Sequence, residues 1–176
     1  MLTLEEIRLN KQKIKCLLIS VNRKGMGSVL SYLETSGFYE VPSSFSRHHN
    51  WRGGLAQHCL GVYQKALEMR ADLPTDSLII AGLLHDICKA GKYYYDEKGQ
   101  LHHRRTHIKG HGRRSIILLE RYGLEMTPEE YRAIRWHMGG HHVYTEKEKY
   151  DVELARNELL WSVIHNADHI NAKENI

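Results

Sequence analysis

The sequence predicts an all-α protein, a compact helical bundle that forms one domain. Apolar residues recur at three- and four-residue spacing along most of the 176-residue chain, as in amphipathic helices. The alternation of strands and helices that is typical of an α/β sheet does not appear in the sequence. Hydrophobic residues make up 41% and charged residues 26%, as in soluble globular domains, and a chain of this length can bury an ordinary core. We therefore expect residues 1–176 to form a single domain.

The first 40 residues are expected to form two helices. Residues 3–20 repeat an apolar side chain at every third or fourth position. A shorter helix follows two glycines and ends at Gly37, because glycine commonly terminates a helix. Both helices of residues 1–40 are expected to pack on a core formed by residues 41–172.

The middle of the chain is expected to contain the most buried helix. Residues 39–54 are rich in Pro, Ser, Asn and Gly without periodicity, which predicts a loop. A helix is expected over residues 55–69, and residues 75–89 are so apolar that a helix there must be buried. Residues 92–107 look irregular, and a small β-hairpin near residues 93–101 fits their turn residues.

Three further helices are expected in the last third of the chain. The first spans residues 115–122. Thr127 followed by Glu130 forms the pattern of a capping box and predicts the start of a helix that runs to about Met138. A last helix is expected to start near Asp151.

Composition narrows the classes of protein to which the chain can belong. No apolar run approaches the roughly 18 residues of a membrane-spanning helix. The first residues lack the layout of a secretory signal. Three scattered cysteines are too few for a disulfide scaffold, which favours a reducing compartment. We therefore expect a cytoplasmic protein that does not bind membranes; the oligomeric state stays open.

Positive charge gathers in the middle of the chain. The formal net charge is +4, yet residues 47–114 alone carry twelve Lys and Arg against six Asp and Glu. This distribution favours a small anionic substrate, such as a phosphate ester. The total is too modest for a dedicated DNA-binding protein, so no nucleic-acid partner is expected.

Histidine and aspartate residues recur inside or beside the apolar faces of the expected helices. The chain has 13 histidines. Burying imidazole or carboxylate among Leu and Ile is costly unless the groups are paired or bind a metal. Nitrogen and oxygen donors together suit Fe, Mn, Co, Ni or Zn better than Mg. The candidate residues are His58, His85, Asp86, His111, His137 and Asp168.

The short sequence motifs around these residues resemble those of a known family. GGLAQH ends at His58, LLHDICK contains His85 and Asp86, and KGHG contains His111. Together they resemble the HD-domain superfamily of metal-dependent phosphohydrolases, over roughly residues 40–172. The chain is similar to the HD domain of bacterial exoribonuclease-type proteins, which often have an HHN-x-x-GGL entry like the one that begins at His48.

The resemblance implies a ligand set. By it, His58, His85, Asp86 and Asp168 would bind a first divalent transition metal. Asp86 would bridge to a second metal held by His111 and His137. The superfamily contains mononuclear and binuclear members, and the presence of both histidines favours two metals. His141 and His142 compete with His137 for the last position; we favour His137 because it directly follows a helix.

The expected function is hydrolysis of a phosphate ester, of a nucleotide or another small phosphorylated metabolite, by a metal-bridging hydroxide. Asp86 and Lys89 are the expected catalytic residues, and Lys89, His49 and His141 are expected to contact the substrate. Two alternatives remain open: a di-iron oxygenase that uses the same ligands, and a metal-bound regulatory module without turnover.

Overall fold

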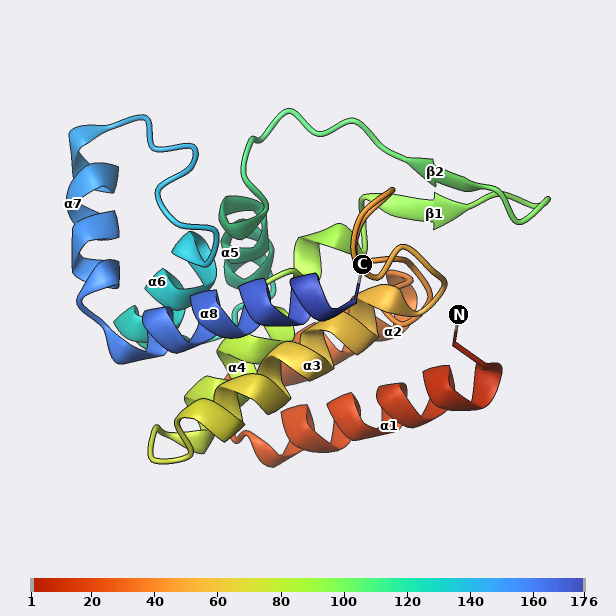
Figure 1. Ribbon diagram of the computed structural model, residues 1–176, viewed down its shortest axis with the longest axis horizontal. Coiled ribbons are helices and arrows are strands. Elements are labelled where there is room, and N and C mark those ends of the chain that lie inside the picture. Colours follow the sequence, from red (N-terminus) through yellow and green to blue (C-terminus); the bar gives the residue numbers. More distant parts are fainter. Residues whose placement is uncertain (1, 176) are drawn as a thin grey trace.

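The computed structural model describes residues 2–175 and is built from helices and one small hairpin, as the sequence predicts (Figure 1). The hairpin pairs its strands antiparallel, with Tyr93 opposite His103. In chain order the elements are α1 (Leu4–Ser20), α2 (Met26–Thr35), α3 (Gly54–Met69), α4 (Thr75–Leu84), the 3-10 turn η1 (Ile87–Lys89), β1 (Tyr93–Tyr95), β2 (Leu101–His103), α5 (His111–Arg121), α6 (Pro128–Trp136), α7 (Glu146–Arg156) and α8 (Leu159–Glu174).

Helix α4 is the centre of the bundle. Every residue from Ser77 to Leu84 is buried, which agrees with the expectation from its apolar sequence. Helices α3, α6 and α8 pack around it, and α8 runs beside α3 across the front of Figure 1. Helices α1 and α2 add Leu18 and Leu33 to the same hydrophobic core, so the first two helices share an interior with the rest of the chain.

The helix start at Thr127 is confirmed, and its capping glutamate also forms a buried ion pair. Thr127 and Glu130 exchange the two hydrogen bonds of a capping box. The Glu130 carboxylate is fully buried and also accepts hydrogen bonds from Arg23, at 2.8 and 3.1 Å, and from the Ser77 hydroxyl, at 2.7 Å. A buried carboxylate needs such partners. This contact joins the α1–α2 connection to α6.

The prediction of one continuous helix over residues 75–89 is wrong. Helix α4 ends at Leu84, and Asp86 leaves the helical region with φ −112° and ψ 15°. The chain resumes as the 3-10 turn η1, which ends in Lys89. The apolar composition signals burial of this stretch and contains no local signal for the break. The break matters because it sets the direction of the side chains around Asp86.

Two other helix boundaries differ from the sequence prediction. Residues expected as one last helix from Asp151 form two, α7 and α8, because Glu158 takes an extended conformation between them. Helix α5 begins at His111 instead of 115. No helix within residues 2–175 is both long and apolar enough to cross a membrane.

Candidate metal centre

Four side chains from three parts of the fold form a first group of ligand atoms. His58 lies in the middle of α3, His85 and Asp86 follow α4, and Asp168 lies on α8. His58 Nε2 is 3.1 Å from Asp168 Oδ1 and 3.7 Å from Asp86 Oδ2. His85 Nε2 is 3.3 Å from His58 Nε2 and 3.5 Å from Asp86 Oδ2. The atoms converge on one small volume.

A second group faces the other oxygen of the same carboxylate. Asp86 Oδ1 is 3.8 Å from His111 Nε2, at the start of α5, and 3.7 Å from His137 Nε2, just after α6. Asp86 Oδ1 and His137 Nε2 are buried, and neither has a hydrogen-bond partner among the described residues. Unpaired buried polar atoms are costly, and a cation between them would satisfy both. The donor set therefore fits a metal.

The outer nitrogens of three histidines are fixed by oxygen acceptors. The Nδ1 atoms of His85 and His137 lie 2.9 and 2.7 Å from the carbonyl oxygens of Gly82 and Ile134. The Nδ1 atom of His58 lies 3.0 Å from Asn171 Oδ1. A carbonyl oxygen only accepts, so each Nδ1 carries the proton and each Nε2 offers its lone pair to the centre.

The electrostatics keep two of these histidines neutral and the carboxylates ionised. Burial lowers the pKa of His137 to about 4 and that of His111 to about 3. Burial alone would raise the pKa of Asp86, but the charge of Lys89 and the interactions with His111 and His85 outweigh it, so this pKa lies well below its usual value. The pKa of Asp168 is also lowered: burial opposes the shift, and the hydrogen bond with His58 dominates it. Neutral imidazoles and ionised carboxylates are the forms that bind metals.

Close backbone packing brings the donors together. A Cβ on Gly82 would lie 2.8 Å from the Cα of Tyr63, so α4 approaches α3 more closely there than a side chain allows. A Cβ on Gly112 would lie 2.4 Å from the carbonyl oxygen of Arg135, so the start of α5 lies directly on the last turn of α6. These contacts set His85 beside His58, and His111 beside His137.

The residues expected to contact substrate are placed differently from one another. Lys89 Nζ lies 2.6 Å from Asp86 Oδ2, with 13% of the side chain exposed. His141 is exposed and lies outside the two ligand groups, in the wall of a pocket of about 130 Å³ that it shares with His111. His49 lies next to His58 but is 1% exposed, so it is closed off from solvent.

Sequence reasoning missed two residues of this centre. Asn171 holds His58, and its only sequence signal is its position three residues after Asp168, on the same face of a helix. His48 packs against His58, with ring centroids 4.9 Å apart. In the sequence His48 appears only as the first histidine of the HHN-x-x-GGL motif, and the motif assigns it no role.

Comparison with known proteins finds a curated relative and a family model that match much of the chain. The chain is 26% identical over 144 residues to dihydroneopterin 2',3'-cyclic phosphate phosphodiesterase of Methanocaldococcus jannaschii. The aligned region covers 77% of this chain and 53% of the relative. The chain thus spans about half the length of this curated relative. No solved structure gives a significant match. The family model of the HD domain matches residues 55–170, more than half of the chain, so the chain belongs to the HD domain family.

Proposed function

We propose that the chain hydrolyses a small phosphate ester at a two-metal centre. The observation that carries this proposal is the orientation of Asp86. Its Oδ2 faces His58 and His85, and its Oδ1 faces His111 and His137. A carboxylate with one oxygen toward each group can join two cations, and paired cations serve the hydrolysis of phosphate esters.

The proposed ligands divide into two sets that share one residue. The first divalent transition metal (Fe, Mn, Ni, Co or Zn) would be held by His58, His85, Asp86 and Asp168. The second would be held by Asp86, His111 and His137. Bound there, the ions would supply a water of lowered pKa as nucleophile and would neutralise charge on the phosphoryl group.

Lys89 and His141 are the proposed substrate contacts at the edge of this centre. The Lys89 ammonium lies against Asp86 and is almost buried, so it can donate to a phosphate oxygen beside that carboxylate. Burial alone would lower the pKa of Lys89, but the charge of Asp86 raises it by more. The pKa therefore lies above its usual value, and Lys89 stays protonated. His141 lies in the wall of the small pocket next to His111 and is proposed to contact the outer part of the substrate.

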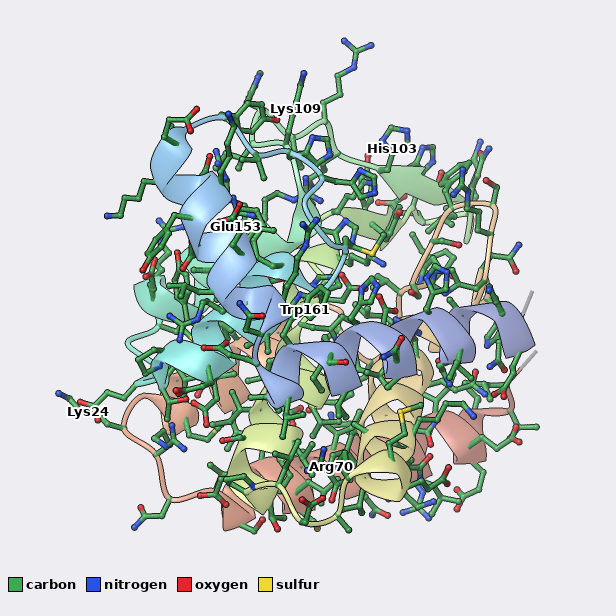
Figure 2. All side chains as sticks on the ribbon, turned by 60° about the vertical axis from the view of Figure 1, so that its left-hand side comes forward. Lys24, Arg70, His103, Lys109, Glu153 and Trp161 are labelled. Atoms are coloured by element: carbon green, nitrogen blue, oxygen red, sulfur yellow. The ribbon has the colours of Figure 1, made fainter. Side chains whose placement is uncertain are left out.

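The substrate is proposed to be a small cyclic or linear phosphodiester. The curated relative is named for a 2',3'-cyclic phosphate, which supplies the first compound class to test. The exposed residues 103–109, which lead into His111, carry Arg104, Arg105 and Lys109 and no acidic residue. Figure 2 shows His103 and Lys109 on the face where nitrogen-bearing side chains gather. Positive charge beside the centre would attract an anionic substrate.

We also propose that residues 1–40 belong to the same domain as the metal-binding residues 41–172. Leu18 of α1 and Leu33 of α2 are fully buried in the core cluster that includes Leu55 and Leu84. Removing these helices would expose that core. We therefore expect a variant without residues 1–40 to aggregate or unfold.

The test is hydrolysis of nucleoside 2',3'-cyclic phosphates and of matched phosphomonoesters by protein loaded with Fe, Mn, Co, Ni or Zn. We expect the ring of the cyclic phosphate to open, and phosphorus NMR measures this opening. We expect the Asp86→Asn variant to lose this turnover. Turnover that is unchanged in Asp86→Asn would contradict the proposal. So would metal-loaded protein that is inert toward every ester.

A further inference from the structure

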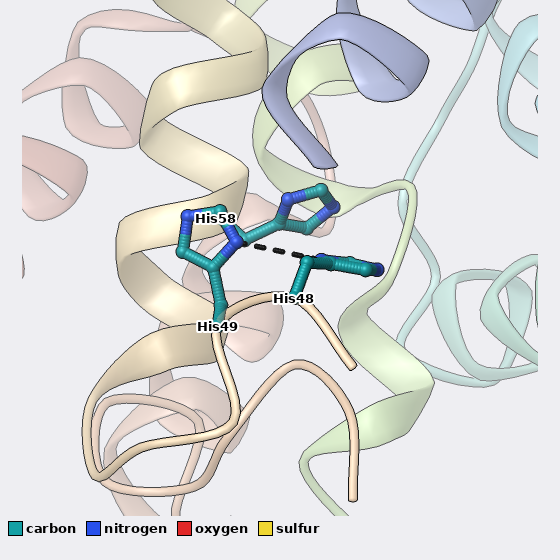
Figure 3. Close-up of side chains that lie close together, drawn as sticks. All are labelled: His48, His49 and His58. Atoms are coloured by element: carbon teal, nitrogen blue, oxygen red, sulfur yellow. Dashed lines mark hydrogen bonds between the residues drawn. The ribbon is translucent and has the colours of Figure 1, made fainter. Parts of the chain in front are cut away.

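Three histidines meet beside the first ligand group. His48 and His49 lie on the loop before α3, and His58 lies on α3 (Figure 3). The Nδ1 atoms of His48 and His49 are 3.4 Å apart. The rings of both pack on the ring of His58, with centroid distances of 4.9 and 5.1 Å. Neither residue belongs to the proposed ligand set.

A third metal at this cluster is disfavoured by the bonding of His58. Its Nδ1 is engaged by Asn171, and its Nε2 lies 3.1 Å from Asp168 Oδ1. Only His48 and His49 would remain as donors, and two imidazoles do not make a four-coordinate site. Their Nδ1 atoms are instead within hydrogen-bond reach of each other, so one donates and the other accepts.

His49 is held rigidly beneath His48. Its side chain is buried, and its φ of 49° lies in the left-handed region, which few residues other than glycine adopt. Its backbone N–H donates to Asn175 at the end of α8, and its carbonyl accepts from Ser43. A Cβ on Gly54 would lie 2.2 Å from that carbonyl oxygen, so the glycine is needed for α3 to start there. The HHN-x-x-GGL motif therefore encodes a backbone conformation that fixes the position of the His49 side chain.

His48 is the more accessible member of the pair. It is partly exposed, whereas His49 is 1% exposed. Its ring reaches away from His49, as Figure 3 shows, and packs on the ring of His58. The Ser44 hydroxyl holds the turn by donating to the His48 carbonyl at 2.8 Å. This partly exposed imidazole therefore lies directly beside His58, one of the proposed ligands of the first metal.

We propose that His48 donates its Nε2–H to a phosphoryl oxygen of the substrate and that His49 is a positioning residue. His49 donates from Nδ1 to His48 Nδ1, which leaves the single proton of neutral His48 on Nε2, on the side of the ring away from His49. This inference rests on the proposed function for the identity of the anion. It adds a substrate contact that lies outside the matched family region, residues 55–170.

The test is the affinity of metal-loaded protein for inorganic phosphate, measured by calorimetry together with metal content and kcat/KM. His48→Leu is expected to weaken phosphate binding about tenfold or more, the usual effect of losing a hydrogen bond to a charged group, with metal content unchanged. His48→Gln, whose amide N–H replaces Nε2–H, is expected to restore most of the affinity. The matched control is His102→Leu on the hairpin, where the histidine pairs with Asp96.

His49 is tested by its own pair of variants. Asn tolerates the left-handed backbone and places an N–H near the position of Nδ1, so His49→Asn is expected to keep phosphate affinity. His49→Ala removes the donor and is expected to weaken phosphate binding several-fold, with circular dichroism confirming that the variant is folded.

The outcomes separate this inference from the proposed function. Phosphate affinity that is unchanged in His48→Leu overturns the inference even if esters are hydrolysed. Loss of metal in His48→Leu also overturns it, because His48 is then a ligand. Wild-type protein that binds no phosphate overturns it too. If phosphate binding depends on His48 but no ester is hydrolysed, the inference stands and the proposed function fails.

Discussion

Asp86 Oδ1 lies 3.7 Å from His137 Nε2, and both atoms are buried without a hydrogen-bond partner in the part of the chain that the structure describes. A protein rarely leaves two facing polar atoms unsatisfied. The other oxygen of Asp86 is engaged by Lys89 at 2.6 Å. The unpaired atoms therefore support the proposal of a second cation between α6 and the turn after α4.

Replacing Asp86 with Asn is expected to lower kcat/KM more than about a hundredfold and to reduce the bound metal, because the shared carboxylate is lost. The amide keeps the size of the side chain, so the fold should survive. Elemental analysis and steady-state kinetics measure the two effects. A control, Asp96→Asn, changes a partly exposed carboxylate on the hairpin, outside both ligand groups, and should leave both unchanged. Full metal content in Asp86→Asn would argue against a bridging role.

Asn171→Ala is expected to lower metal affinity or activity about ten- to a hundredfold. Its side-chain oxygen fixes the proton of His58 on Nδ1, and supports of this kind contribute by that amount. Asn166→Ala, which changes an exposed asparagine on the same helix, is the matched control. Titration with Mn or Co measures the affinity. Equal affinities in the two variants would show that Asn171 does not orient His58.

Gly112→Ala is expected to weaken the second metal site selectively. The added methyl would meet the backbone oxygens of Arg135 and Ile134 at 2.4 and 2.8 Å, so α5 must move away from α6. We expect a loss of about 1–3 kcal/mol of unfolding free energy, and one tightly bound metal instead of two. Gly27→Ala, which meets nothing within 4 Å, should leave metal binding unchanged and slightly raise stability. Two metals retained in Gly112→Ala would contradict the expectation.

Metal-free protein is expected to lose stability as the pH falls from about 7 to about 4. Burial lowers the pKa of four histidines, to about 4 for His48 and His137 and to about 3 for His49 and His111. Unfolding returns them to about 6.5, so the unfolded state binds more protons in this range. His85, whose pKa is raised because the charge of Asp86 outweighs burial, acts in the opposite direction but is one group against four.

Urea unfolding with EDTA at pH 7.5 and pH 5 measures this effect. The midpoint should be lower at pH 5 with an unchanged slope. The lowered pKa values of Asp86 and Asp168 matter only below about pH 4, where their unfolded forms take up protons. Metal-loaded protein should be more stable than metal-free protein at pH 7.5, because metal binds the folded state. A midpoint that rises on acidification would contradict the assignment of neutral buried histidines.

The parts of the fold that follow from local pattern were predictable. The capping box at Thr127 is a signal within four residues, and the burial of α4 follows from its composition. The six candidate ligands were found because polar side chains on apolar helix faces are costly, and the structure brings all six together. Their binding of metal remains a prediction.

The parts that depend on tertiary contacts were not predictable. Nothing in the sequence around Asp86 marks the end of α4, because residues 87–90 include neither Gly nor Pro and their conformation is decided by packing. The same holds for Glu158, which separates α7 from α8. The roles of Asn171 and His48 were missed for a related reason: each acts through a contact with His58, and that contact exists only after α3 and α8 have packed.

Helix α8 supports both halves of the centre. Asp168 on this helix faces His58, and His165, one turn earlier, hydrogen-bonds the backbone carbonyl of His137. A shift of α8 would move Asp168 in one half of the centre. It would also move His165, which holds the backbone of His137 in the other half. The two halves are therefore mechanically linked, and a substitution that displaces α8 should disturb both ligand groups together.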